Sequence, residues 1–188
     1  EAWESDGNQE VIVATQTGQA IRFHEDEVRP TGRGSQGVRG ISLEGVDIVI
    51  GMVVADDDTD LLTVSELGYG KRARVSDYRL TRRGGKGVIN IKTTERNGGV
   101  VAIKAIQEDD EVMIISQDGI LIRLPIADVS TIGRNTQGVR LINLDEGDRV
   151  IDVARVDEGR AEGDEEGPSE SGSAQPSSNG EAGRSAES

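Results

Sequence analysis

A stretch that occurs three times along the chain decides the fold. It reads VIVATQTGQAIRFHEDEVRPTGRGSQGVRGISL from Val11, LLTVSELGYGKRARVSDYRLTRRGGKGVINIKT from Leu61 and VMIISQDGILIRLPIADVSTIGRNTQGVRLINL from Val112. Glycine and arginine return at matching positions, 50 and 51 residues apart. The matching sets are Gly18, Gly68 and Gly119; Arg22, Arg72 and Arg123; Arg33, Arg83 and Arg134; and Gly37, Gly87 and Gly138. A fixed period of this length is typical of repeated units that pack on their neighbours.

Each repeat predicts four short strands. An apolar run rich in β-branched residues meets a turn that contains glycine, and a second run follows, which together form a hairpin signal. A polar connection of about a dozen residues then leads to a Gly-Val-x-x-Ile strand (residues 37–43, 87–91 and 138–144) and a final apolar strand (residues 48–54, 100–106 and 150–156). With 25 glycines and no sustained helical period, the chain is expected to contain no long helix.

These repeats favour an all-β fold, a propeller-like array of four-stranded blades of which about three are present. An all-β sandwich of twelve short strands is the alternative. We expect blades at residues 11–56, 61–109 and 111–156, after an inter-blade loop at residues 1–10. Residue 1 is glutamate rather than methionine, and three blades are too few to close a ring, so we expect a piece of a longer protein with further blades upstream.

Charge is distributed unevenly along the chain. The 188 residues carry 35 acidic and 21 basic side chains, for a formal net charge of −14. Residues 157–188 hold a net charge of −7 in a Gly, Ser, Glu and Pro mixture, so we expect a disordered acidic tail there. Residues 71–104 hold ten bases and two acids, a local charge of +8. This segment, rather than the average charge, indicates a polyanionic partner.

Composition excludes several classes of site. The chain has no cysteine and one histidine, which excludes disulfides, thiol catalysis and metal sites built from several histidines. Its longest apolar runs, about eight residues, are far shorter than the ~20 residues that span a bilayer. We therefore expect a soluble protein with no membrane partner and no catalytic or metal-binding residue in this chain.

The connection between the second and third strands of the second repeat carries the candidate site. Its glycines let the backbone approach a ligand closely, and the interleaved cations supply donors suited to phosphate. The predicted contacts in this loop are Arg82, Arg83, Gly84, Gly85, Lys86 and Gly87. The loop lacks the Gly-x-x-x-x-Gly-Lys-Ser/Thr pattern, and no helix follows it, so a nucleotide P-loop is disfavoured. A solvated glycine-rich turn is the alternative interpretation.

Weaker candidates surround this loop and its counterparts. The strand before the loop carries Lys71, Arg72 and Arg74. In the first and third repeats, the position of Arg83 is occupied by Arg33 and Arg134. A row of cations at a repeated position would follow a DNA backbone rather than read bases. With only two tyrosines in the chain, an aromatic platform for single strands is disfavoured. The predicted ligand is duplex DNA, held by its phosphates and bent.

At this loop the sequence resembles a known family. The segment RRGGKG at residues 82–87 is similar to the box Gln-Arg-Arg-Gly-Gly-Lys-Gly of the C-terminal domain of the bacterial DNA gyrase A subunit. The flanking segments GYGKR (68–72), GVINIK (87–92), ERNG (95–98) and GRNTQGV (133–139) are similar to late blades of that domain. The resemblance covers residues 8–156. Thr81 stands where the box has glutamine, and the box usually lies in the first blade, so the loop is either the defining box or a later, box-like loop.

The resemblance implies a β-pinwheel that wraps DNA around a basic rim and so helps gyrase introduce negative supercoils at the expense of ATP. It implies two partners, duplex DNA and the B subunit of gyrase, within an A2B2 heterotetramer, and a location in the bacterial cytoplasm with the nucleoid. No cofactor is implied in this chain, because ATP and Mg²⁺ would belong to the holoenzyme. The cleaving tyrosine would lie earlier in the A subunit, so this chain would not be catalytic alone.

Two rival functions and one regulatory hypothesis accompany this interpretation. The related C-terminal domain from the A subunit of topoisomerase IV also binds DNA but lacks the box. A protein-interaction propeller would use its acidic connections, Asp56–Asp58 and Glu108–Glu111, as the docking surface. The acidic tail at residues 157–188 is predicted either to compete with DNA for the rim or to act only as a solubilising segment.

Overall fold

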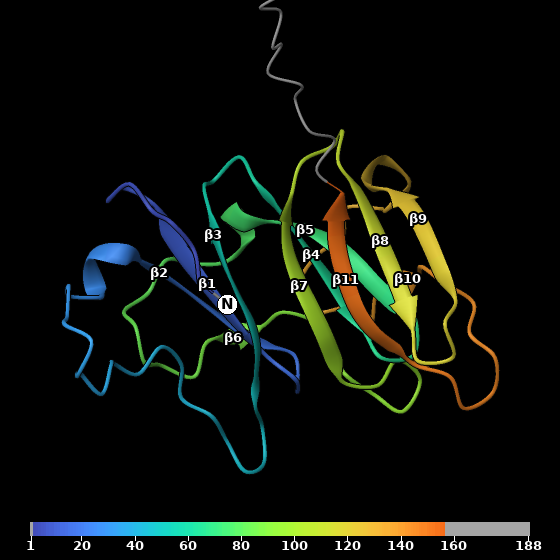
Figure 1. The fold of residues 1–188 in the computed structure, drawn as a ribbon, viewed down its shortest axis with the longest axis horizontal. Helices are drawn as coiled ribbons and strands as arrows, with labels where there is room; N and C mark the ends of the chain where they lie inside the picture. The colour runs from blue at the N-terminus through green and yellow to red at the C-terminus, as the bar shows by residue number, and fades with distance from the viewer. Residues whose placement is uncertain (1, 157–188) are drawn as a thin grey trace, which may run out of the picture. The chain divides into compact units, whose positions relative to one another are not determined.

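Eleven β-strands in three antiparallel sheets make up the part of the chain that the computed structural model describes, residues 2–156 (Figure 1). The tail predicted at residues 157–188 lies outside the described residues. The strands are β1 (Glu10–Thr15), β2 (Gln19–His24), β3 (Val49–Ala55), β4 (Asp60–Ser65), β5 (Tyr69–Arg74), β6 (Val88–Ile89), β7 (Val100–Ile106), β8 (Glu111–Ser116), β9 (Leu121–Pro125), β10 (Val139–Arg140) and β11 (Val150–Val156). Three 3-10 turns, η1 (Glu25–Glu27), η2 (Val75–Asp77) and η3 (Ile126–Asp128), are the helical segments of this region. The predicted all-β, propeller-like class is confirmed.

None of these helical segments within residues 2–156 has the length and apolar character needed to cross a membrane.

Strand order shows that neighbouring repeats share strands. The three sheets have the orders β3-β1-β2-β6, β10-β5-β4-β7 and β11-β8-β9. The outermost strand of the first sheet, β6, belongs to the second repeat, and the outermost strand of the second sheet, β10, belongs to the third repeat. The structure therefore corrects the expectation that each repeat supplies all four strands of its own blade.

Backbone contact between repeats explains this exchange. Val88 pairs with Ala20 and Val139 with Gly70, so each Gly-Val segment completes the sheet of the repeat before it. A Cβ atom on Gly87 would lie 2.3 Å from the carbonyl oxygen of Ala20, so only glycine permits this approach. The corresponding segment of the first repeat, residues 37–43, forms no strand, because no earlier sheet is present among the described residues to pair with it.

The predicted hairpin turns are confirmed, and they serve a second purpose. Gly18 and Gly68 adopt positive φ values of 88° and 79°, which the turns after β1 and β4 require. The next repeat crosses directly over each turn: Asn90 N donates to the carbonyl oxygen of Gly18 at 2.8 Å, and Leu141 N donates to that of Gly68 at 2.8 Å. The turns therefore anchor the following repeat as well as reversing the chain.

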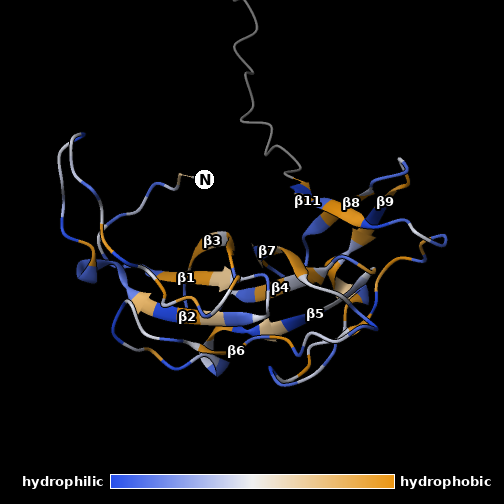
Figure 2. Ribbon diagram, turned by 90° about the horizontal axis from the view of Figure 1, so that it is seen from below, coloured by the Kyte–Doolittle hydropathy of each residue, from blue (hydrophilic) through white to orange (hydrophobic). Residues whose placement is uncertain are grey.

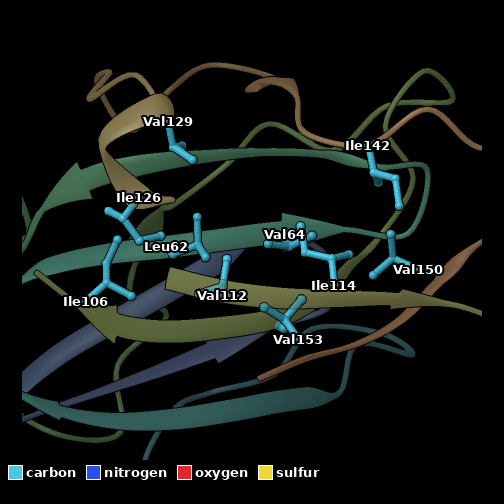
Figure 3. Close-up of a cluster of buried hydrophobic side chains, with 11 residues drawn as sticks. Leu62, Val64, Ile106, Val112, Ile114, Ile126, Val129, Ile142, Val150 and Val153 are labelled. Carbon is cyan, nitrogen blue, oxygen red and sulfur yellow. The ribbon is translucent and has the colours of Figure 1, made fainter. Parts of the chain in front are cut away.

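The hydrophobic core lies between successive sheets. Alternate residues of a strand point to opposite faces, and both faces of the middle sheet are covered. One face contributes Leu61 and Ala73 to a cluster with Ile12 of the first sheet, and the other contributes Leu62 to a cluster with Val112 and Ile114 of the third (Figure 3). Hydrophobic residues accordingly lie along the strands β1, β7 and β8 (Figure 2). Since full burial of a Val, Leu or Ile side chain contributes about 1.5–3 kcal/mol, aliphatic residues stabilise this fold with few aromatic rings.

Candidate nucleic-acid interface

The predicted loop of the second repeat runs along the edge of the first sheet. It lies between η2 and β6 and is attached by three backbone hydrogen bonds: Thr81 N to the carbonyl oxygen of Arg22 at 2.9 Å, Gly84 N to that of Gly40 at 2.7 Å, and Ser42 N to that of Gly85 at 2.8 Å. Leu80, directly before the loop, forms a parallel bridge with Arg22 of β2. The loop is thus held at the sheet edge that β6 completes.

Two of the three predicted cations in this loop point to solvent. Arg82 is exposed, and the Lys86 side chain is 78% exposed. Lys86 forms an ion pair with Glu44, a residue of the first repeat. The hydrogen bond and the charge of Glu44 raise the pKa of Lys86. Gly84 has a positive φ of 84°, and the exposed Gly85 follows it. Arg82 and Lys86 are therefore the cations of this loop that a phosphate can reach.

Arg83, in contrast, is held by hydrogen bonds to the first repeat. Its Nε donates to the carbonyl oxygen of Glu27 at 3.1 Å, and its Nη1 donates to that of Arg39 at 2.5 Å. Its backbone N–H also donates to Glu27 Oε2 at 3.3 Å. Arg83 consequently fastens the second repeat's loop to the first repeat, and only its remaining donors face solvent.

The loop of the third repeat is seated in the same way on the second sheet. Ile132 N donates to the carbonyl oxygen of Arg72 at 2.9 Å, and Lys92 N donates to that of Thr136 at 2.8 Å. Arg134 stacks over Tyr78, with Cζ 5.7 Å from the ring centroid, and its Nη1 donates to the carbonyl oxygen of Ile89 at 3.2 Å. The half-exposed Arg134 therefore occupies an edge position equivalent to that of the second repeat's loop.

Lys71 is buried beneath this third loop. Its side chain is 0% exposed, and its Nζ donates to the carbonyl oxygens of Gly133 at 3.1 Å and Arg134 at 2.9 Å. Burial, and then the charge of Arg134, lower the pKa of Lys71 to about 8. Lys71 fastens the loop to β5, and a DNA phosphate cannot reach it in this structure.

Arg72 and Arg22 connect neighbouring repeats. Arg72 Nε donates to Thr131 Oγ1 at 2.7 Å, and its guanidinium forms ion pairs with Asp60 and Glu108. Arg22 is 6% exposed and donates to the carbonyl oxygens of Val75 at 2.9 Å and Tyr78 at 3.0 Å. Since both side chains are occupied by protein acceptors, the structure removes Arg72 from the accessible cations.

The two remaining predicted residues lie apart from these loops. Arg74, at the end of β5, is exposed beside a cavity of about 640 Å³ that is lined by acids, among them Asp57, Asp58 and Asp109. Arg33 is exposed in the first repeat's loop. Among the predicted residues, the structure therefore brings Arg82, Lys86 and Arg134 to equivalent edges and leaves Arg74 in an acidic environment.

Sequence reasoning missed several cations beside β6 and β10. Arg39, Lys92, Arg96 and Arg140 are exposed there, and Arg96 and Arg140 both stack on Tyr69. Arg39 and Arg140 follow the same Gly-Val pair of their repeats, so an alignment of the repeats could have found them. The acidic runs at Asp56–Asp58 and Glu108–Asp110 instead follow β3 and β7, the strands at the opposite edges of their sheets.

No cluster of three or more histidine, aspartate or glutamate residues in the described part of the chain has the geometry of a metal site.

A family model described as the DNA gyrase C-terminal domain, beta-propeller, matches residues 9–56, 59–107 and 110–157. The DNA gyrase A subunit of Haloquadratum walsbyi is 46% identical over 151 residues, which cover 79% of this chain and 18% of that protein. The DNA gyrase A subunit of Staphylococcus epidermidis is 45% identical over 154 residues, which cover 81% of this chain and 17% of that protein. The chain thus spans less than a fifth of the length of these relatives.

Solved structures agree with this similarity. A DNA gyrase A C-terminal domain superposes with a TM-score of 0.75 at 32% sequence identity, over 80% of this chain and 52% of that one. The C-terminal domain of a DNA topoisomerase IV superposes with a TM-score of 0.76 at 21% identity, over 81% of this chain and 48% of that one, and shows the shared fold.

Proposed function

The chain belongs to the DNA gyrase C-terminal domain family, and from this membership we propose that it binds duplex DNA by its phosphates and bends it along the sheet edges that carry β6 and β10. One observation carries the proposal. The loops at residues 81–87 and 131–137 are seated alike on successive sheets, so each presents a cation at the same kind of sheet edge. Contacts of this kind neutralise phosphates without reading bases.

The rest of the molecule is consistent with backbone binding. Both tyrosines are buried, so neither offers a stacking surface to an unpaired base. The acidic runs lie beside the opposite edge strands, where they repel DNA and so favour its placement at the basic edge. An extended duplex that contacts successive sheets must bend if they are not collinear, and phosphate contacts offset the cost of that bending.

Within a larger protein, the chain would serve as the DNA-wrapping part of the DNA gyrase A subunit. We propose that it joins the B subunit there in an A2B2 heterotetramer in the bacterial cytoplasm, associated with the nucleoid, and assists ATP-dependent negative supercoiling. ATP and Mg²⁺ would act elsewhere in that assembly. Tyr78 donates to Asn90 Oδ1 at 2.6 Å and is fully buried, and burial raises its pKa, so it is not suited to attack DNA.

A gel shift with a duplex of about 150 base pairs, one persistence length, tests the proposal. Replacement of Arg82 and Lys86 by alanine (R82A/K86A) removes two accessible cations of one loop. We expect weaker binding to every sequence and a fall of about 2 in the slope of log affinity against log salt, because each phosphate contact contributes about 0.9.

The matched control is R74A/R123A, which removes the same charge from exposed positions away from the two loops. Its salt slope should remain close to that of the unchanged chain. Equal losses in the two double variants would reduce the effect to net charge and contradict the assigned edge. A protein partner that survives nuclease digestion, without any DNA binding, would favour an interaction propeller instead.

A further inference from the structure

A second basic feature lies where the second and third repeats meet. Around Tyr69, at the start of β5, the structure contains an open cavity of about 250 Å³. Three arginines, Arg96, Arg140 and Arg149, contribute to its lining. They come from different segments: the connection after β6, the strand β10 and the residue before β11. Tertiary structure therefore gathers these cations.

Two of these arginines stack on the same ring. The Cζ atoms of Arg96 and Arg140 lie 4.9 Å and 5.2 Å from the ring centroid of Tyr69, and Arg140 Nη2 donates to Tyr69 Oη at 2.7 Å. The ring is 5% exposed and thus fixed in place. The hydrogen bonds and charges of Arg96, and then of Arg140, lower the pKa of Tyr69. Arg140 Nη1 also donates to Asn143 Oδ1 at 3.2 Å. Stacking on a ring orients a guanidinium, and its remaining donors can bind an anion.

The acidic groups of the cavity do not neutralise these two arginines. Arg149 Nη1 lies 3.7 Å from Glu66 Oε2, so Arg149 already has a carboxylate partner. Asp148 is buried, and its Oδ1 accepts the backbone N–H groups of Asp118 at 3.1 Å and Arg149 at 2.7 Å. Asp145 is exposed. Within residues 2–156, neither Arg96 nor Arg140 forms an ion pair with a carboxylate, so the pair attracts an anion.

The site is particular to this junction and adjoins the third repeat's loop. Where the first and second repeats meet, the positions of Tyr69, Arg96 and Arg140 hold Gln19, Val46 and Ile89, without a cation. At the second junction, Asn97 Nδ2 donates to the carbonyl oxygens of Lys92 at 3.0 Å and Gln137 at 3.1 Å. These bonds tie the Arg96 segment to the end of the loop that carries Arg134. The cavity consequently continues the basic edge along β10.

We propose that the Tyr69 cavity binds a backbone phosphate of duplex DNA through the edge donors of Arg96 and Arg140, next to the contact made by the third repeat's loop. The inference rests on the proposed function, because it identifies a phosphate subsite of the same DNA path. Guanidinium forks match the geometry of phosphate oxygens, and they would bind any DNA sequence alike. The subsite holds the duplex at the junction of two sheets.

The test compares R96Q/R140Q with the unchanged 188-residue chain on the same duplex over a range of salt concentrations. We expect affinity to fall for every sequence and the salt slope to fall by about 1, since one phosphate contact is lost. R123Q/R155Q is the matched control, because both arginines are in the third repeat and already face carboxylates, Glu111 and Asp110. An unchanged slope in R96Q/R140Q would overturn the subsite.

A second measurement follows the ring itself. A phosphate on Arg96 and Arg140 offsets the charges that lower the Tyr69 pKa, so DNA should move the tyrosinate absorbance transition of Tyr69 to higher pH. Ionisation of Tyr78 is shifted upward by burial, which keeps it separate. If DNA causes no such shift while R82A/K86A still weakens DNA binding, the subsite is overturned but the proposed function stands. Failure of the unchanged chain to bind DNA overturns both.

Discussion

The two junctions between repeats share a backbone arrangement and differ in their side chains. At the first junction, the loop at residues 81–87 lies on β2, and at the second, the loop at residues 131–137 lies on β5 in the same way. A buried arginine connects the repeats at both, Arg22 at the first and Arg72 at the second. Beneath the loops, however, Ile21 at the first junction corresponds to Lys71 at the second. The shared features therefore build the array, and the differing ones determine what each edge can bind.

The largest expected effect concerns the connecting arginines. Substitution R22M leaves two buried carbonyl groups and the largely buried Glu10 without their donor, so we expect a loss of about 3–5 kcal/mol in the free energy of unfolding. R72M should cost less, because Arg72 donates to the Thr131 hydroxyl instead of two buried carbonyl groups, and R123M should cost least, because Arg123 is 52% exposed. Urea unfolding of the three variants measures this order. Equal losses would contradict the view that Arg22 is the strongest connection between repeats.

An intermediate effect depends on pH and separates the two junctions. Substitution K71I gives the second junction the residue of the first. The folded pKa of Lys71, about 8, lies below the usual value for lysine, so between these values the unfolded chain holds more protons and stability rises with pH. We expect the unchanged chain to gain about 1–3 kcal/mol relative to K71I between pH 7 and pH 10. Parallel pH profiles of the two proteins would show that Lys71 is not a buried cation.

The smallest effect concerns the turn that opens the third repeat. In the first repeat, Thr17 Oγ1 donates to Asp47 Oδ2 at 2.6 Å. In the third repeat, Asp118 replaces the threonine and Asp148 corresponds to Asp47. Asp148 is 2% exposed, and its Oδ2 has no hydrogen-bond partner within residues 2–156. Substitution D118T supplies a hydroxyl donor, so we expect a gain of about 1 kcal/mol. Thermal unfolding measures it, with T17V as the reverse control that should lose stability.

Part of the fold was predictable because it depends on local signals. The period of the repeat, the positive-φ glycines at the hairpin turns and the absence of long helices all follow from residues near one another in the chain. The strand exchange was missed because a Gly-Val strand looks the same whether it completes its own sheet or the one before. Pairing of Val88 with Ala20 spans more than one repeat, and no local pattern encodes it.

The candidate site was predictable only at the level of the loop. Sequence reasoning placed Arg82, Lys86 and Arg134 in the loops that recur in the second and third repeats, and the structure seats these loops on equivalent edges. It also selected Lys71, whose Nζ binds carbonyl groups 62 and 63 residues further along the chain. A cation count over residues 71–104 cannot tell an exposed side chain from one that a later repeat covers.

The amino-acid sequence by itself determined the repeat, the class of fold and the family, because hydrophobic period, turn glycines and the RRGGKG motif are read within short windows. Tertiary structure alone decided which arginines join the repeats, which lysine is buried and where Arg96 and Arg140 meet around Tyr69. The reason is physical: whether a cation reaches solvent depends on what packs over it, and for Arg22, Lys71 and Arg72 the covering chain comes from the next repeat.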